Sequence, residues 1–246
     1  TRLLAQLISD VVVITWTTIW VLVGMAVHAA VSTIAEVGRQ VQDGGFLERA
    51  EVAARDVSPG RILLYFGGWA RRRGYDTLLA LAAESRDAVV LSVGRPTADD
   101  GFENETRALR SLLRSDGRLL EVELPFVASQ EYMARLFALP AFVVLPYRDF
   151  YGVSGSLIQA CLHGKPVVAP AVGWMGTTIS ACKIGIAYRH RDFNSLTAAV
   201  GRIRSEYERY APAAERFGAS FTGASVFESL EAGLRAAELP EQGERT

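Results

Sequence analysis

The chain has 246 residues, half of them apolar, so it can bury a sizeable core and is neither a disordered nor a fibrous chain. Its 26 basic and 27 acidic residues leave a formal net charge of -1. Overall charge therefore favours neither nucleic acid nor an anionic membrane surface as a partner, and any anion site must be local. The length suits one large or two modest domains.

The two cysteines, Cys161 and Cys182, form no metal-ligand spacing with any of the three histidines. This pattern predicts no metal site. It favours reduced thiols in a cytosolic protein.

The first 57 residues are the least regular part of the sequence. The uncharged run 11–35 is long enough to cross a bilayer, so a membrane-anchored protein is one alternative. The β-branched residues at 11–15 and the lack of a flanking basic cluster favour instead two strands at 10–15 and 22–28, a helix at 32–41 and a turn at 42–45. The chain starts at Thr1 without an initiator methionine or a basic leader, so we expect no signal peptide, and a fragment of a longer protein is an open alternative.

From position 58 onward, short apolar runs alternate with helical patterns. The runs are continuously apolar, as in strands that are covered on both faces. This alternation predicts an α/β fold with a doubly wound, Rossmann-like parallel sheet. The predicted strands are 62–66, 89–93, 119–124, 142–145 and 166–169, and the predicted helices are 77–84, 103–113, 130–137 and 156–162.

The carboxyl-terminal part is predicted to be helical. We expect a helix at 195–210, an interruption at Pro212 and a final amphipathic helix at 225–238, with a frayed tail beyond Pro240. The predicted division is an amino-terminal segment and linker at 1–57, an α/β domain at 58–203 and carboxyl-terminal helices at 204–246.

A glycine-rich basic loop follows the first of these strands. Gly67 and Gly68 let the backbone turn closely, and Arg71, Arg72 and Arg73 stand in succession just after them. Arginine pairs bidentately with phosphate oxygens, so one or more of the three could clamp a diphosphate. The alternative is a solvated basic loop.

A second polar loop follows the strand at 142–145. Ser154, Gly155 and Ser156 open a helix there, and the unpaired N–H groups of its first turn suit a phosphate. By the helical period, Gln159 can face the same cleft as Asp149, where the two could bind sugar hydroxyls. Alternatively, Asp149 and Ser156 only cap the helix.

Several motifs in this order resemble the carboxyl-terminal, donor-binding domain of retaining GT-B glycosyltransferases of group 1, the glycogen-synthase and α-mannosyltransferase type. The matching segments are Gly67-Gly68, Arg73 to Leu79, Val93 to Arg95, Val144 to Tyr147, and Gly164 to Pro170. The resemblance covers roughly residues 58 to 238. The amino-terminal part resembles a shortened acceptor domain, with Glu48–Arg55 similar to the helical linker after it.

The resemblance implies roles for individual residues. Gly67 and Gly68 would approach the diphosphate, with Gly68 standing where the family has an arginine and Arg73 where it has a lysine. Phe126 and Val127 would lie near the base. Asp149 and Gln159 stand for the family's pair of glutamates. We therefore expect Arg73 and Asp149 to be catalytic, and the donor-binding residues to be Gly67, Gly68, Arg71, Phe126, Val127, Ser154, Gly155, Ser156 and Gln159.

The resemblance implies a hexosyltransferase that moves a sugar from a UDP- or GDP-sugar to a glycan or lipid-linked acceptor, with retention and with neither metal nor cofactor. It implies a cytoplasmic protein of polysaccharide biosynthesis, and leaves open a peripheral position at the inner face of the membrane. The alternative is a non-catalytic nucleotide-sugar-binding or partner module.

Overall fold

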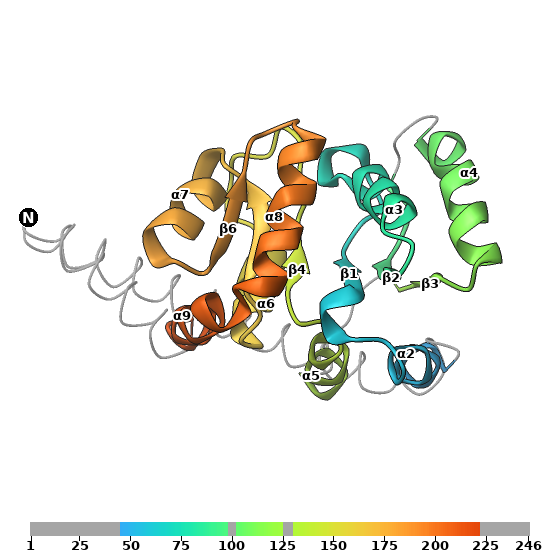
Figure 1. The fold of residues 1–246 in the computed structure, drawn as a ribbon, viewed down its shortest axis with the longest axis horizontal. Coiled ribbons are helices and arrows are strands. Elements are labelled where there is room, and N and C mark those ends of the chain that lie inside the picture. Colours follow the sequence, from blue (N-terminus) through green and yellow to red (C-terminus); the bar gives the residue numbers. More distant parts are fainter. Residues whose placement is uncertain (1–44, 98–101, 125–129, 222–246) are drawn as a thin grey trace, which may run out of the picture.

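The computed structural model describes residues 45–97, 102–124 and 130–221 (Figure 1). The strands and helix predicted before residue 45, the uncharged run 11–35 and the helix at 225–238 lie outside these ranges. Within the described ranges, no helix is both long enough and apolar enough to cross a membrane.

The first sheet consists of three parallel strands in the order β1-β2-β3. They are β1 (Ile62–Phe66), β2 (Val89–Gly94) and β3 (Leu119–Glu123). Leu64 pairs with Leu91, and Val90 with Leu119. The residues of β2 are all buried, which confirms the prediction that continuous apolar runs are strands covered on both faces.

The second sheet consists of β4 (Val143–Val144), β5 (Val167–Pro170) and β6 (Gly185–Tyr188), again parallel and in that order. Strand β6 and the helix before it, α7 (Gly173–Cys182), were not predicted, because the glycines at 173 and 176 resemble turn residues. Gly176 lies inside α7, where a Cβ would come 2.6 Å from the carbonyl carbon of Ala171. This glycine serves close packing rather than a turn.

Strands β1 and β4 lie next to each other, but they belong to separate hydrogen-bonded sheets. The six strands therefore follow the order β3-β2-β1-β4-β5-β6, in which the direction of winding reverses between β1 and β4. In open α/β sheets, ligands bind at the carboxyl ends of the strands beside such a reversal. The fold class is the predicted one, and the boundary between β1 and β4 is where a ligand site is expected.

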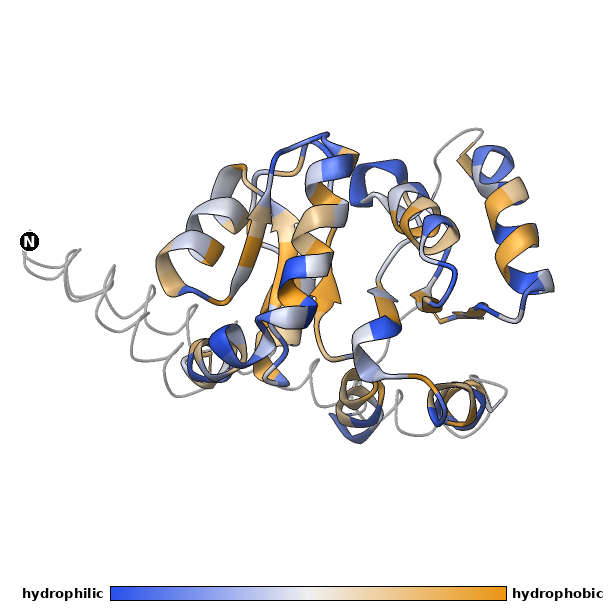
Figure 2. Cartoon of the chain, in the orientation of Figure 1, coloured by the Kyte–Doolittle hydropathy of each residue, from blue (hydrophilic) through white to orange (hydrophobic). Residues whose placement is uncertain are grey.

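Helices cover both faces of the sheets, and the hydrophobic strands lie between them (Figures 1 and 2). One core packs against α2 (Phe46–Ala54), α5 (Gln130–Ala138), α6 (Gly155–Leu162), α7 and α9 (Tyr207–Ala219). The other packs against α3 (Tyr75–Glu84), α4 (Phe102–Ser115) and α8 (Phe193–Ser205). Leu63 and Leu64 enter different cores, because successive side chains of a strand point to opposite faces.

The helices at both ends of the described chain are part of these cores. Phe46 and Leu47 of α2 and Ala214 of α9 are buried in the first core, and Tyr210 of α9 is buried in the second. The predicted boundary between 203 and 204 falls inside α8. The described helices α2 and α9 thus pack against the sheets formed by residues 62–188 and stabilise them.

The prediction of one helix at 195–210 ending before Pro212 was wrong. The chain forms two helices, α8 and α9, which meet at Glu206, and Pro212 lies inside α9. Proline removes one backbone hydrogen bond to the carbonyl four residues earlier, here that of Glu208. Both Glu208 and Pro212 are exposed, so water can bind the freed carbonyl and the helix continues.

The histidine at the end of α6 provides a test of pH dependence. His163 stacks on Phe137 with ring centroids 5.0 Å apart, and its burial, with a smaller contribution from Lys165, lowers its pKa. The folded state therefore binds fewer protons than the unfolded chain, and we expect the free energy of unfolding to fall as the pH drops below about 6.5. Urea titrations at about pH 7 and about pH 5 should show a smaller difference for His163→Gln than for the wild type. An equal difference would contradict the role of His163.

Candidate functional site

The carboxyl ends of β1 and β4 are joined by contacts between the two loops that follow these strands. The N–H of Arg148 donates to the carbonyl oxygen of Arg72 at 2.8 Å. Gly74, with φ of +67°, approaches Pro146 so closely that a Cβ would lie 1.8 Å from the Pro146 oxygen. The predicted basic loop and the predicted polar loop thus meet above the boundary between the two sheets.

Gly67 and Arg73 face each other just after the carboxyl end of β1. A Cβ at Gly67 would lie 2.4 Å from Nη1 of Arg73, so the guanidinium occupies the space that the missing side chain leaves. The guanidinium also lies 5.7 Å from the centre of the Tyr147 ring. No carboxylate pairs with Arg73 among the described residues, so its charge is available to an anionic ligand.

The three arginines of the loop point in different directions. They form a 3₁₀ turn, η2 (Arg71–Arg73), in which three residues complete one turn and successive side chains diverge by about 120°. Arg71 forms an ion pair of 2.6 Å with Glu105 of α4, and Arg72 is exposed. Arg73 is the member of the three that faces Gly67. Geometry therefore separates residues that the sequence presents as equivalent.

Gly68 is enclosed rather than open. The Tyr65 hydroxyl donates to its carbonyl oxygen at 2.7 Å, and a Cβ would lie 2.7 Å from Cγ2 of Thr97. The family that the sequence resembles has an arginine at the position of Gly68. An arginine side chain here would require Thr97 to move. Arg73 thus supplies the guanidinium of this loop that lies beside Gly67.

The first turn of α6 lies at the carboxyl end of β1, because the Ser156 hydroxyl donates to the carbonyl oxygen of Phe66 at 3.2 Å. Ser154 is its N-cap and accepts a hydrogen bond from the N–H of Leu157 at 3.2 Å. The cap is Ser154, so the alternative that Asp149 and Ser156 cap this helix was wrong. Gly155 is exposed, with open space where a Cβ would stand. The N–H groups of Gly155 and Ser156, at the start of the helix, are left for an anion.

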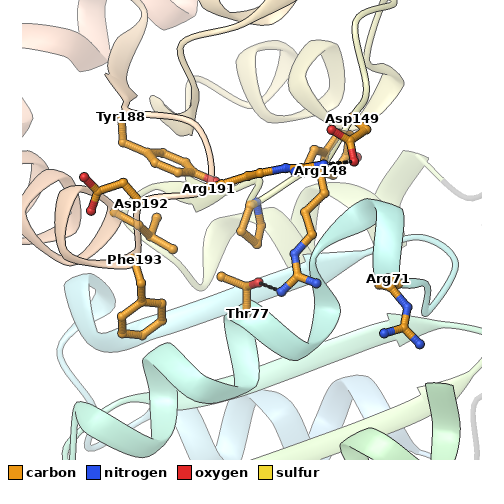
Figure 3. Close-up of a pocket in the computed structure, with 11 residues that line it drawn as sticks. Arg71, Thr77, Arg148, Asp149, Tyr188, Arg191, Asp192 and Phe193 are labelled. Atoms are coloured by element: carbon orange, nitrogen blue, oxygen red, sulfur yellow. Dashed lines mark hydrogen bonds and ion pairs between the residues drawn. The ribbon is translucent and has the colours of Figure 1, made fainter.

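A pocket of about 440 Å³ is lined in part by residues of these two loops (Figure 3). It lies where β4, β6, α3 and α8 come together. Its lining is mixed, with polar and charged side chains beside aromatic rings. The lining residues are Arg71, Thr77, Pro146, Tyr147, Arg148, Asp149, Tyr188, Arg191, Asp192, Phe193 and Leu196.

Two ion pairs shape this pocket. Asp149 accepts from Nη2 of Arg191 at 2.6 Å, and both residues have positive φ, +50° and +60°. Arg148 donates to Asp76 at 2.6 Å and to Thr77 at 2.8 Å. A positive φ in residues other than glycine is uncommon and is enriched at functional sites. The balanced charges suit a ligand that is rich in hydroxyl groups better than a second phosphate.

Tyr188 forms part of the wall of the pocket (Figure 3). Its side chain is buried, and burial raises the pKa of its phenol, an effect that the nearby Arg148 partly offsets. Its hydroxyl therefore stays protonated at neutral pH and can donate a hydrogen bond.

The structure brings some of the predicted residues together and separates others. Gly67 and Arg73 face each other at the end of β1, and Ser156 links the first turn of α6, which follows the N-cap Ser154 and begins at Gly155, to the same end of that strand. Asp149 lies in the pocket, whereas Gln159 is not among its lining residues, so the expected pairing of the two is not seen there. Phe126 and Val127 lie outside the described residues.

Sequence reasoning assigned no role in the site to Tyr147 or Arg191. Tyr147 directly follows Pro146 at the end of a strand, which is a usable signal. Arg191 is 42 residues from its partner Asp149, and no local pattern reveals that contact. Within the part of the chain that the structure describes, no three histidine, cysteine or acidic side chains gather as metal ligands.

The parallel strands and their order, which reverses between β1 and β4, define a Rossmann-like α/β domain. No protein-family model matches the sequence, and no curated protein matches it at a significant level. Several solved structures are similar to this chain. Sucrose-phosphate synthase from Thermosynechococcus elongatus is 26% identical, with a TM-score of 0.57 over 77% of this chain and 49% of that one. HepE of Anabaena, in complex with UDP-glucose, is 14% identical, with a TM-score of 0.63 over 80% and 53%.

A third similar structure is the C-terminal domain of a glycosyl transferase group 1 family protein from Francisella tularensis. It is 13% identical, with a TM-score of 0.53 over 70% of this chain and 92% of that domain. The chain has the fold of the carboxyl-terminal domain of group 1 GT-B glycosyltransferases, as its motifs predict. It spans about half the length of sucrose-phosphate synthase and HepE.

Proposed function

We propose that this chain is the donor-binding part of a glycosyltransferase that moves a hexose from a nucleoside-diphosphate sugar to a glycan or lipid-linked acceptor, with retention and without a metal. The observation that carries the proposal is the placement of Arg73. Its guanidinium lies beside Gly67 and has no carboxylate partner among the described residues, and the N-terminus of α6 is hydrogen-bonded to the same end of β1 through Ser156.

The chemistry would be electrostatic. When the bond between the sugar and the diphosphate breaks, negative charge grows on the departing diphosphate. Arg73 can donate two parallel hydrogen bonds to phosphate oxygens, and the N–H groups of Gly155 and Ser156 can donate at the positive end of α6. Donors that are already in place stabilise this charge without reorganisation.

The donor is proposed to be a UDP- or GDP-sugar. HepE, which shares the fold, was solved with UDP and with UDP-glucose, and this supports a nucleotide-sugar donor here. The 440 Å³ pocket has room for a sugar, and Asp149 and Arg191 could exchange part of their ion pair for hydrogen bonds to its hydroxyls. Gln159, Phe126 and Val127 stay proposed contacts of ribose and base. A cytoplasmic role in polysaccharide biosynthesis, with or without peripheral membrane association, belongs to the same proposal.

A non-catalytic nucleotide-sugar-binding module is the second candidate. It is favoured by the ion pair of Asp149 with Arg191, which occupies the carboxylate proposed as catalytic. Both candidates predict binding of the donor, and only the first predicts turnover. Release of nucleoside diphosphate from a bound nucleotide sugar, measured with an acceptor glycan present, separates them.

The first test is a thermal-shift panel of UDP, GDP, ADP and their sugar conjugates against the full chain. A ligand that binds only the folded state raises the melting temperature. We expect one diphosphate and its sugar conjugate to stabilise the protein selectively. No shift with any of them would contradict the proposed function.

Gly155→Ala tests the helix N-terminus directly. The added methyl group meets open space in the protein, so stability should change by less than about 0.5 kcal/mol. The same methyl group would stand where the diphosphate approaches, so affinity for that ligand should fall about tenfold, or about 1.4 kcal/mol. Isothermal titration calorimetry of this variant and of Gly201→Ala, whose added methyl group also meets open space, gives the comparison. Equal affinities would place the phosphates elsewhere.

A further inference from the structure

Tyr147 is a buried side chain at the boundary between the two sheets, with 4% of its surface exposed. It contacts both of the loops that form the proposed phosphate site. We propose that Tyr147 is a positioning residue for the diphosphate: its hydroxyl fixes the first turn of α6, and its ring holds the guanidinium of Arg73. This inference rests on the proposed function and names a residue that acts through its neighbours rather than by touching the ligand.

The hydroxyl group of Tyr147 begins a chain of two hydrogen bonds. It donates to Oγ of Ser156 at 3.1 Å, and the Ser156 hydroxyl donates to the carbonyl oxygen of Phe66 at 3.2 Å. Ser156 has a single hydroxyl proton and uses it in the hydrogen bond to the Phe66 carbonyl oxygen, so its oxygen accepts from Tyr147. The Ser156 side chain therefore connects the start of α6 to the end of β1 by a hydrogen bond. The backbone N–H of Ser156 remains available to a phosphate.

This connection matters because the two sheets share no strand ladder at the boundary. The relative position of β1 and α6 depends on side-chain contacts and on loop contacts there. Since Tyr147 and Ser156 are both buried, their hydrogen bonds are shielded from water. Loss of either hydroxyl would loosen the N-terminus of α6 relative to Gly67, and with it the spacing of the phosphate donors.

The ring of Tyr147 makes a different contribution. The guanidinium carbon of Arg73 lies 5.7 Å from the ring centre, and Phe150 packs edge-on against the same ring at 5.3 Å. An aromatic face attracts a cation without neutralising it. By contrast, Arg71, Arg148 and Arg191 are each paired with a carboxylate. Arg73 is thus held in place with its charge and its hydrogen-bond donors still available.

The experiment compares the affinities of wild type, Tyr147→Phe, Tyr147→Leu and Ser156→Ala by calorimetry, with UDP and GDP as probes and with uridine and guanosine as phosphate-free controls. We expect Tyr147→Leu to weaken diphosphate binding about tenfold, and Tyr147→Phe and Ser156→Ala to weaken it about threefold each. Binding of the nucleosides should stay unchanged, because they lack the phosphates.

A double-mutant cycle gives a readout that a purely structural role would not produce. In the Arg73→Ala background, Tyr147→Leu should weaken binding much less than in the wild type, because the guanidinium that the ring holds is already absent. Likewise, Tyr147→Phe and Ser156→Ala together should weaken binding no more than either alone. If Tyr147→Leu fails to fold, the Phe and Ala variants decide the question.

Two kinds of result would overturn the inference. If wild-type protein binds a diphosphate and Tyr147→Phe and Ser156→Ala bind it equally well, Tyr147 does not position the site, and the proposed function stands. Full additivity of Tyr147→Leu with Arg73→Ala would likewise show that the ring does not act through Arg73. If the wild type binds neither UDP nor GDP, the proposed function fails together with this inference.

Discussion

Gly74→Ala is expected to lower the free energy of unfolding by on the order of 3 kcal/mol. Gly74 has φ of +67°, a conformation that costs an alanine about 1 kcal/mol or more. In addition, the new Cβ would lie 1.8 Å from the oxygen and 2.6 Å from the carbonyl carbon of Pro146. These are backbone atoms, so no side chain can rotate away, and the two loops above the sheet boundary would have to separate.

Urea denaturation measures this effect. The matched control is Gly201→Ala on α8, where an added methyl group meets open space and helix propensity favours alanine by about 1 kcal/mol. The two substitutions add the same atoms, and the backbone effects at the two positions account for about 2 kcal/mol of the difference between them, so the excess over that reports the contact with Pro146. A Gly74→Ala protein as stable as the wild type would show that the loops do not pack as described.

Arg73→Ala is expected to weaken binding of the nucleoside diphosphate by about 1.5–3 kcal/mol, which is the range for hydrogen bonds to charged groups. The variant removes the guanidinium beside Gly67. This guanidinium has no carboxylate partner among the described residues, so a phosphate can bind it without displacing one. Removing an arginine that is not ion-paired should change stability little. Calorimetric titration with UDP and GDP, with urea denaturation alongside, measures both quantities.

The control for Arg73→Ala is Arg72→Ala, which removes the same charge one residue away. Arg72 is exposed, and the contact that the structure gives to this residue is the hydrogen bond from Arg148 to its backbone carbonyl. Its truncation should weaken binding by less than about 0.5 kcal/mol, through loss of long-range attraction alone. Equal losses for the two variants would show that net charge, and not the position of Arg73, governs binding.

The strands and helices beside the boundary between the two sheets were predictable because their signals are local. The continuous apolar runs at 62–66 and 89–93 indicate covered strands, and Ser154 before a helical pattern indicates an N-cap. Helix α7 and strand β6 were missed because a glycine that packs against backbone resembles a glycine that turns the chain. The distinction at Gly176 depends on the folded backbone, in which an added Cβ would lie 2.6 Å from the carbonyl carbon of Ala171.

The sequence by itself determined the α/β class, the parallel strands and the placement of Gly67, Arg73 and Ser154 at their carboxyl ends, because hydrophobic period and turn chemistry act over a few residues. Only the tertiary structure decided which arginine lies beside Gly67, because that choice depends on the 3₁₀ turn at 71–73 and on Glu105 of another helix. It also decided that Asp149 pairs with Arg191 and that Tyr147 reaches Ser156. Such contacts arise when the strand order brings separate loops to one edge of the sheets. A local sequence pattern does not predict which residues of those loops meet.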